Sequence, residues 1–134
     1  MRYRLSMLLF LFGIATAIYG QNLLKHEWKF NTGDDLAWAQ SSFDDSQWRI
    51  MEAGSTWENQ GLGTYDGFGW YRQQVMVPES LQKEALNNGG LVLYLGRIDD
   101  CDVSYWNGEV IGQTGKMPPG YVTGYGEDRA YPIP

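Results

Sequence analysis

The sequence from Leu91 to Gly112 reads LVLYLGRIDDCDVSYWNGEVIG and predicts three short strands in succession. Residues 91–95 are aliphatic or aromatic, and the glycine and two carboxylates within 96–100 indicate a sharp bend after them. A second strand begins at Val103. Asn107-Gly108 then predicts a type I′ hairpin turn, because both central residues of that turn need positive φ. Strands, bend and hairpin together are typical of a β-sandwich.

The sequence on either side predicts more short strands separated by turns. Trp28 and Phe30 alternate with charged residues, which is the period-two pattern of a strand with one buried face. Residues 70–78 predict another strand, residues 36–39 a short irregular or helical turn, and residues 80–84 a single helical turn. The 134-residue chain is long enough for one domain with its own core.

After Gly112 the alternating pattern ends, and the sequence predicts no final strand. A sandwich needs its terminal strands to pair and to cover its core. We therefore expect an all-β sandwich that is truncated before its last strands. Such a domain would expose an unpaired edge and apolar surface, and would tend to aggregate.

Residues 1–20 have the layout of a secretory signal peptide. Two arginines precede an apolar run over 7–14, and small residues follow at 15–17. The apolar centre is short for a membrane span. We expect cleavage near Gly20, a folded domain over residues 21–134, and a secreted or periplasmic protein. An uncleaved N-terminal anchor is the alternative.

The charge of the chain bears on its partners. The formal net charge is −6, and removal of residues 1–20 takes away two arginines and no acidic residue, which lowers it to −8. The phosphates of nucleic acids and of anionic membranes would be repelled by such a surface, so neither is expected as a partner. An acidic surface does not repel neutral sugars, which stay possible partners.

The sequence offers little for catalysis. A single cysteine, Cys101, and a single histidine, His26, exclude an internal disulfide and leave no zinc site or Cys–His pair to propose. We expect Cys101 to be a buried thiol. There is no Gly-x-Ser-x-Gly motif, and Gly67-x-Gly69 precedes a strand rather than a helix, so neither a serine hydrolase site nor a phosphate loop is indicated.

Pairs of carboxylates are the next candidates. A glycosidase needs two carboxyl groups about 5 to 10 Å apart, whereas those at 99–100 are adjacent and more simply cap backbone N–H groups. The pairs at 34–35 and 44–45 could supply oxygen ligands to a structural calcium ion. Turn capping is the alternative for these pairs as well, and no other cofactor is expected.

The glycine-rich loop over residues 59–69 is the better candidate for a binding site. Sugars present apolar C–H faces that stack on aromatic rings, and hydroxyls that pair with carboxylates, amides or arginine. Six Trp, nine Tyr and seventeen Gly suit either an aromatic core or an aromatic binding face. The candidate carbohydrate-binding residues around this loop are Glu58, Tyr65, Asp66, Trp70 and Arg72.

A structural interpretation of the same residues stays open. In it, Trp70 and Tyr71 belong to the core and Arg72 pairs with a buried acid to fix the sheet. The loop would then either have no ligand or rim the active site of a neighbouring domain.

Several short motifs, in order along the chain, resemble a known family. They are Trp28-Lys29-Phe30, Phe43-Asp44-Asp45-Ser46-x-Trp48, Trp57-Glu58, Asp66-Gly67-x-Gly69-Trp70-Tyr71-Arg72, Pro78, Leu95-Gly96-Arg97-Ile98-Asp99-Asp100, Asn107-Gly108 and Gly112. This order resembles the N-terminal sugar-binding domain of glycoside hydrolase family 2, a galactose-binding-like jelly roll. Sialate O-acetylesterases contain a similar domain, and residues 66–72 and 96–100 are at least as similar to it. Cys101 and Trp106 stand where the family usually has smaller aliphatic residues.

The resemblance implies a carbohydrate-binding, non-catalytic domain of an exported β-galactosidase-like or β-glucuronidase-like hydrolase. Its partner would be a glycan or glycoside, and the acid and nucleophile would belong to a separate catalytic domain that this chain lacks. Two alternatives remain at this point. The domain is the jelly-roll insert of a sialate O-acetylesterase-type carbohydrate esterase, or it is a purely structural domain without a ligand.

Overall fold

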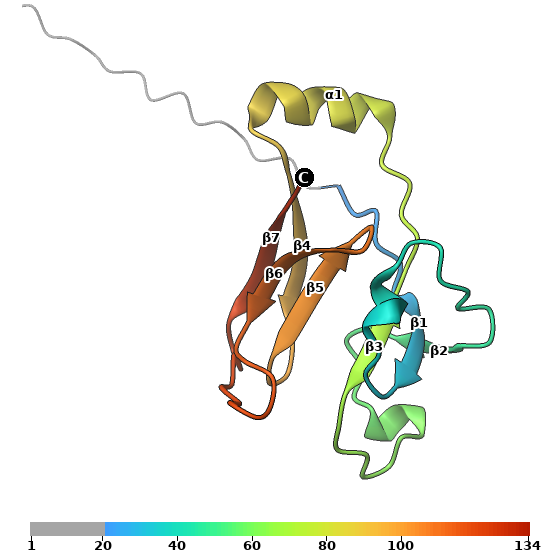
Figure 1. Ribbon diagram of the computed structural model, residues 1–134. Helices are drawn as coiled ribbons and strands as arrows, with labels where there is room; N and C mark the ends of the chain where they lie inside the picture. The colour runs from blue at the N-terminus through green and yellow to red at the C-terminus, as the bar shows by residue number, and fades with distance from the viewer. Residues whose placement is uncertain (1–20) are drawn as a thin grey trace, which may run out of the picture.

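The computed structural model describes residues 21–134, which fold mainly as antiparallel strands with little helix (Figure 1). The predicted all-β class is confirmed. The predicted signal peptide lies outside the described residues. The strands are β1 (Glu27–Thr32), β2 (Arg49–Glu52), β3 (Gly69–Arg72), β4 (Leu91–Arg97), β5 (Asp102–Trp106), β6 (Glu109–Thr114) and β7 (Asp128–Ile133). The helices are the 3₁₀ turns η1 (Leu36–Ala39) and η2 (Glu58–Gln60), and the α-helix α1 (Glu79–Asn88).

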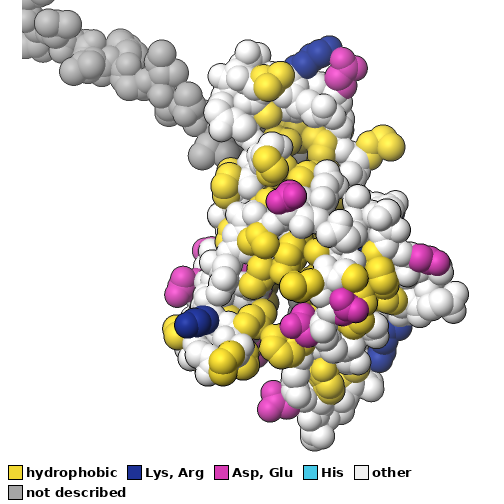
Figure 2. All heavy atoms as spheres, in the orientation of Figure 1, with side chains coloured by type: hydrophobic (Ala, Val, Ile, Leu, Met, Phe, Trp, Pro, Cys, Tyr) yellow, Lys and Arg dark blue, Asp and Glu magenta, His cyan; other side chains and the backbone are white. Residues whose placement is uncertain are grey.

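The strands form two groups (Figure 1). One is a three-stranded sheet in the order β2-β1-β3. The other holds the pairs β4-β7 and β5-β6, and β6 lies against β7. The view in Figure 2, which shares the orientation of Figure 1, shows hydrophobic side chains gathered between the two groups, with acidic side chains among them.

The core of the three-stranded sheet is centred on Phe30. Its side chain is buried, and its ring meets Tyr71 and Trp57 edge-on, with centroid distances of 4.8 and 5.7 Å. A Cβ at position 69 would lie 2.7 Å from the Phe30 ring and 2.5 Å from that of Trp57. Gly69 is therefore needed so that the two rings can pack against the backbone of β3.

Strand β3 ends at Arg72, well before the predicted end at residue 78. Beyond it, the side chain of Gln73 takes over the pairing. Its amide nitrogen donates to the carbonyls of Lys25 and Glu27, and its amide oxygen accepts the Lys25 N–H. A side chain that satisfies these backbone groups removes the need for a longer strand.

The segments from residue 79 to residue 112 follow the sequence predictions closely. The predicted helical turn at 80–84 lies in the first half of the longer helix α1, which ends at Asn88 and is capped by Gly89 with φ 87°. Asn107 and Gly108 adopt φ 50° and 91°, so the predicted hairpin turn between β5 and β6 is confirmed.

The predicted absence of a strand after Gly112 is wrong. Strand β7 pairs with β4 from Leu91↔Ile133 to Arg97↔Asp128, with a register shift between Tyr94 and Gly96. The buried positions of β7 include an arginine, Arg129, and the strand contains Pro132, which cannot donate to a ladder. Neither feature suits the apolar alternation by which strands are recognised.

The two groups of strands are joined by aromatic stacking. Trp70 of β3 stacks on Tyr105 of β5, with centroids 5.3 Å apart and planes 23° apart. The Trp38 ring, from η1, meets Trp70 edge-on at 6.0 Å. Within residues 21–134, no helix is long and apolar enough to cross a membrane.

Candidate functional site

The residues predicted to bind sugar around the glycine-rich loop divide into two kinds. Glu58, at the start of η2, and Asp66, in the loop, are exposed. Tyr65 is half-buried: its ring lies 5.7 Å from that of Trp57, and its hydroxyl donates to the carbonyl of Phe68 at 3.0 Å. Tyr65 thus holds the loop together by its own contacts.

Trp70 and Arg72 also make contacts within the fold. The Trp70 indole donates to Oδ1 of Asp34 at 2.9 Å while its ring stacks on the neighbouring strand group. The Arg72 Nε lies 2.9 Å from Oδ2 of Asp45, and Nη1 donates to the carbonyl of Trp38. These contacts match the structural interpretation, in which Arg72 pairs with an acid to fix the sheet.

One carboxylate of each pair considered for calcium caps a turn. Asp35 Oδ1 accepts the N–H of Ala37, and Asp44 Oδ1 accepts that of Ser46, both at 2.9 Å. The second of these bonds lowers the pKa of Asp44. In the part of the chain that the structure describes, no three His, Cys, Asp or Glu residues gather as a metal site would require.

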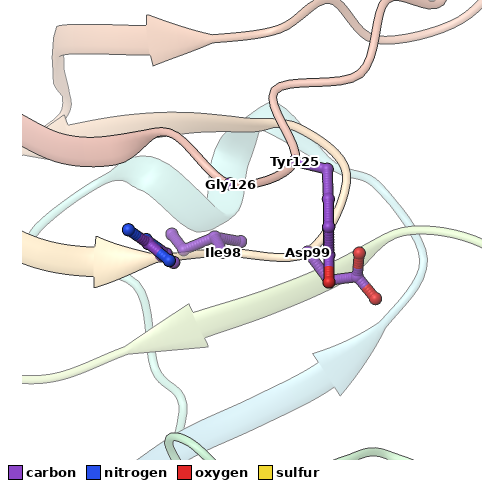
Figure 3. A pocket seen from close by; sticks show the side chains of 5 residues that line it. Ile98, Asp99, Tyr125 and Gly126 are labelled. Carbon is purple, nitrogen blue, oxygen red and sulfur yellow. The ribbon is translucent and has the colours of Figure 1, made fainter.

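A hollow of about 290 Å³ lies elsewhere, where β4 ends and the loop before β7 passes over it (Figure 3). Arg97, Ile98 and Asp99 line one side, and Tyr125 and Gly126 line the other. The Tyr125 side chain is 75% exposed, so its ring is accessible to a ligand. Below, we call this site the β4-end hollow.

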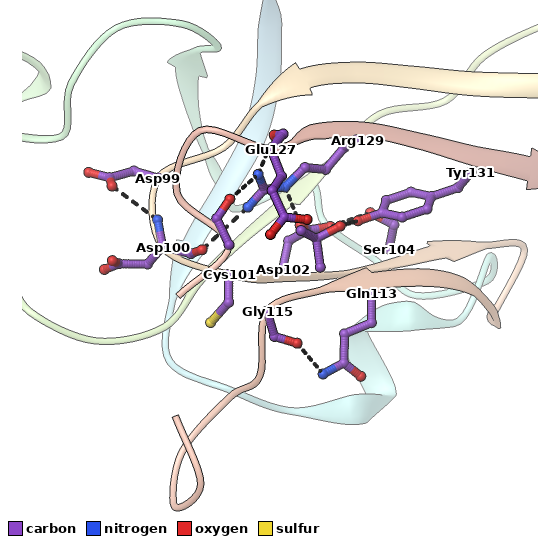
Figure 4. Close-up of polar contacts among 12 residues, drawn as sticks. Asp99, Asp100, Cys101, Asp102, Ser104, Gln113, Gly115, Glu127, Arg129 and Tyr131 are labelled. Atoms are coloured by element: carbon purple, nitrogen blue, oxygen red, sulfur yellow. Dashed lines mark hydrogen bonds and ion pairs between the residues drawn. The ribbon is translucent and has the colours of Figure 1, made fainter. Parts of the chain in front are cut away.

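Both sides of the β4-end hollow are fixed by one buried side chain, Arg129 (Figure 4). Its Nε lies 2.8 Å from Oδ1 of Asp102, and its Nη1 donates to the carbonyls of Gly124 and Glu127 at 2.7 and 2.5 Å. Its Nη2 donates to the carbonyl of Asp100 at 3.3 Å. The guanidinium therefore joins the bend after β4 to the loop that carries Tyr125.

The bend and the loop are also joined directly. The Gly124 N–H donates to the Asp100 carbonyl at 2.5 Å, and the Tyr121 hydroxyl donates to Asp100 Oδ1 at 2.7 Å. The second bond raises the pKa of Tyr121, because it stabilises the neutral hydroxyl. Asp100 itself adopts φ 62°, an unusual backbone conformation for a residue other than glycine.

The charges in the β4-end hollow are unequally paired. Arg97 Nε lies 3.4 Å from Oδ1 of Asp128, and both side chains are exposed. Asp99 Oδ1 accepts only the N–H of Asp100, at 3.0 Å, and no cation within residues 21–134 forms an ion pair with it. The hollow thus combines an aromatic ring, a free carboxylate and a guanidinium, the groups that recognise a sugar.

This site was not predicted from the sequence. The carboxylates at 99–100 were expected to cap backbone N–H groups, and no role was predicted for Tyr125. The available signal was the position of Tyr125 between Gly124 and Gly126, since a large aromatic residue flanked by glycines on a loop has nothing beside it to pack against.

A second hollow, of about 410 Å³, lies between α1 and the β4-β7 pair. Its lining residues are Gln82, Ala85, Leu86, Gly89, Gly90, Leu91, Ile133 and Pro134. Only one of these has a polar side chain. The second hollow therefore lacks the polar groups that would orient a sugar.

The single cysteine lies beside the β4-end hollow. Cys101 is partly buried, and its Sγ is 3.4 Å from Sδ of Met117. Burial raises the pKa of this thiol, and the carboxylates of Asp100 and Asp102 raise it further. The raised pKa disfavours the reactive thiolate, but the predicted burial of Cys101 is found only in part.

A scan against protein-family models finds no match to this chain, and neither does a search of the curated proteins or of the solved structures.

Proposed function

We propose that this chain is a carbohydrate-binding accessory domain with a galactose-binding-like jelly-roll fold, belonging to an exported glycoside hydrolase and non-catalytic by itself. The observation that carries the proposal is the β4-end hollow. There the exposed ring of Tyr125 lies in one site with the Asp99 carboxylate and the Arg97 guanidinium.

The size of the β4-end hollow suits one sugar unit. Ligand pockets typically begin at about 300 Å³, and this one measures about 290 Å³. A single hexose ring can lie with its C–H face on Tyr125 while its hydroxyls pair with Asp99 and Arg97. Because Tyr125 is 75% exposed, a longer glycan can continue from this ring into solvent.

The rigidity of its walls also supports a binding role. Because Arg129 is fully buried and bonded to Asp100 and Gly124, which adjoin the two walls, the walls need little rearrangement when a ligand enters. The jelly-roll proposal is supported by the two groups of antiparallel strands with aromatic rings between them. The hydrolase proposal rests on the resemblance of the sequence motifs to family 2, with the esterase insert as its alternative.

A specific observation favours the other candidate, a structural domain without a ligand. Tyr65, Trp70 and Arg72 use their polar groups for contacts inside the fold. If the β4-end hollow does not bind sugar either, the domain's role is to support a neighbouring domain.

Titration of the purified chain with a panel of methyl glycosides tests the proposal, with backbone amide signals followed by nuclear magnetic resonance. We expect saturable shifts at Asp99 and Gly126. Tyr125→Ala should weaken binding about fivefold or more, since an aromatic contact contributes about 1 kcal/mol. Tyr94→Ala is the matched control, because Tyr94 is also exposed and does not line the hollow. Absence of any saturable shift would favour the structural domain.

A further inference from the structure

We infer that the β4-end hollow prefers sugars that carry a free amino group over neutral sugars, and neutral sugars over those that carry a carboxylate. The inference rests on the proposed function and specifies the class of sugar that the hollow takes. The arrangement of charges around Asp99 carries it.

The cations near the β4-end hollow are each offset by a carboxylate or lie outside the hollow. Arg97 pairs with Asp128. Arg129 is buried, and Asp102 and backbone carbonyls take its donors. Lys116, on the same loop as Tyr125, places its Nζ beside Gly120, which does not line the hollow. Among the described residues, Arg97 is therefore the one cation that lines the hollow, and Asp128, 3.4 Å from its Nε, offsets its charge.

The anions near the β4-end hollow are not balanced in this way. Asp99, Asp100 and Glu127 form no ion pair within the described part of the chain. One carboxylate oxygen of Asp100 accepts a hydrogen bond from the Tyr121 hydroxyl. Because that hydroxyl is neutral, it does not balance the negative charge of Asp100. The local charge is therefore negative, and the net charge of −6 on the chain adds repulsion of the same sign.

The positions of Asp99 and Tyr125 explain how the hollow distinguishes these sugars. Both side chains line the same hollow, and Figure 3 shows the Tyr125 side chain extending from its loop toward Asp99. A sugar ring lying on Tyr125 brings its substituents to the Asp99 carboxylate. An ammonium group there donates a charge-assisted hydrogen bond, a hydroxyl donates a neutral one, and a carboxylate is repelled.

The test compares three methyl glycosides that differ by one substituent: methyl glucoside, methyl 2-amino-2-deoxyglucoside and methyl glucuronide. Affinities are measured on the intact chain at pH 6.5, at about 50 and about 300 mM salt, so that screening differs between the two conditions. We expect the amino sugar to bind about two- to fivefold more tightly than the neutral one at low salt, as for a solvent-exposed ion pair. High salt should reduce this difference in affinity between the amino and the neutral glycoside.

Two variants separate a local charge effect from a global one. Asp99→Asn should remove most of the preference for the amino glycoside over the neutral one, because Asp99 is the carboxylate that lines the hollow. Glu109→Gln removes the same charge from an exposed position on β6 outside the hollow, and should keep the preference. Near-ultraviolet circular dichroism checks that both variants fold, and the salt dependence of the unmodified chain tests the inference without any variant.

The outcomes distinguish this inference from the proposed function. Equal affinity for the amino and neutral glycosides, or tighter binding of the glucuronide, would overturn the inference and leave a carbohydrate-binding domain. Equally strong binding of methylamine would overturn it as well, because the site would then take any cation. Absence of binding by all three glycosides would overturn the inference together with the proposed function.

Discussion

Arg129 is a charged residue at a buried position of β7, where the period-two pattern of a strand predicts an apolar side chain. The residue is 0% exposed, and its partner Asp102 is 9% exposed. Sequence patterns treat arginine as a surface residue, so they predict neither the ion pair nor the strand that contains it. The aromatic core residue Phe30 was predictable because its burial follows from its apolar side chain alone.

The buried pair leads to the first prediction. Arg129→Met should lower the free energy of unfolding by about 3 to 5 kcal/mol, because it leaves the Asp102 carboxylate buried without its countercharge. Urea denaturation, followed by tryptophan fluorescence, measures the change. Arg97→Met is the matched control: its ion pair with Asp128 is exposed, and the expected cost is about 0 to 1 kcal/mol. Similar losses in both variants would contradict the structural role of Arg129.

Between elements, what could be predicted depends on how far apart the partners lie in the sequence. The β5-β6 hairpin is encoded locally by Asn107-Gly108, and it was predicted correctly. Strand β7 pairs with β4, more than thirty residues earlier, and no local signal marks that pairing. The β4-end hollow was missed for the same reason, since it forms only when β7 brings Tyr125 over the end of β4.

The packing of β6 on β7 leads to the second prediction. A Cβ at position 112 would lie 2.0 Å from Cδ1 of Tyr131, whose ring is buried and whose hydroxyl is bonded to Thr114 and Asp102. Gly112→Ala should therefore cost about 1 to 3 kcal/mol of stability through overpacking. Thermal unfolding measures the loss, with Gln113→Ala, an exposed change on the same strand, as the control expected to stay within about 0.5 kcal/mol. A loss no larger than that of the control would mean that Tyr131 moves aside at little cost.

For the molecule as a whole, strand β4 presents an exposed, uncharged edge. Among the described residues it pairs only with β7, and no charged residue occurs from Leu91 to Gly96. Val92 and Tyr94 are 63% and 60% exposed on its outer face. Exposed apolar edges of this kind promote pairing between molecules, whereas the net charge of −6 opposes it.

These opposing forces give the third prediction. Association between copies of the chain should increase with protein concentration and with salt, because salt screens the repulsion and leaves the apolar contact intact. Tyr94→Lys should shift the population toward monomer at every salt concentration, since a lysine on an edge strand resists pairing. Leu36→Lys controls for the added charge, because Leu36 is 68% exposed on η1, outside the edge. Sedimentation velocity measures the association of the unmodified chain and of the two variants. An unmodified chain that stays monomeric at high salt would show that the outer face of β4 does not promote association.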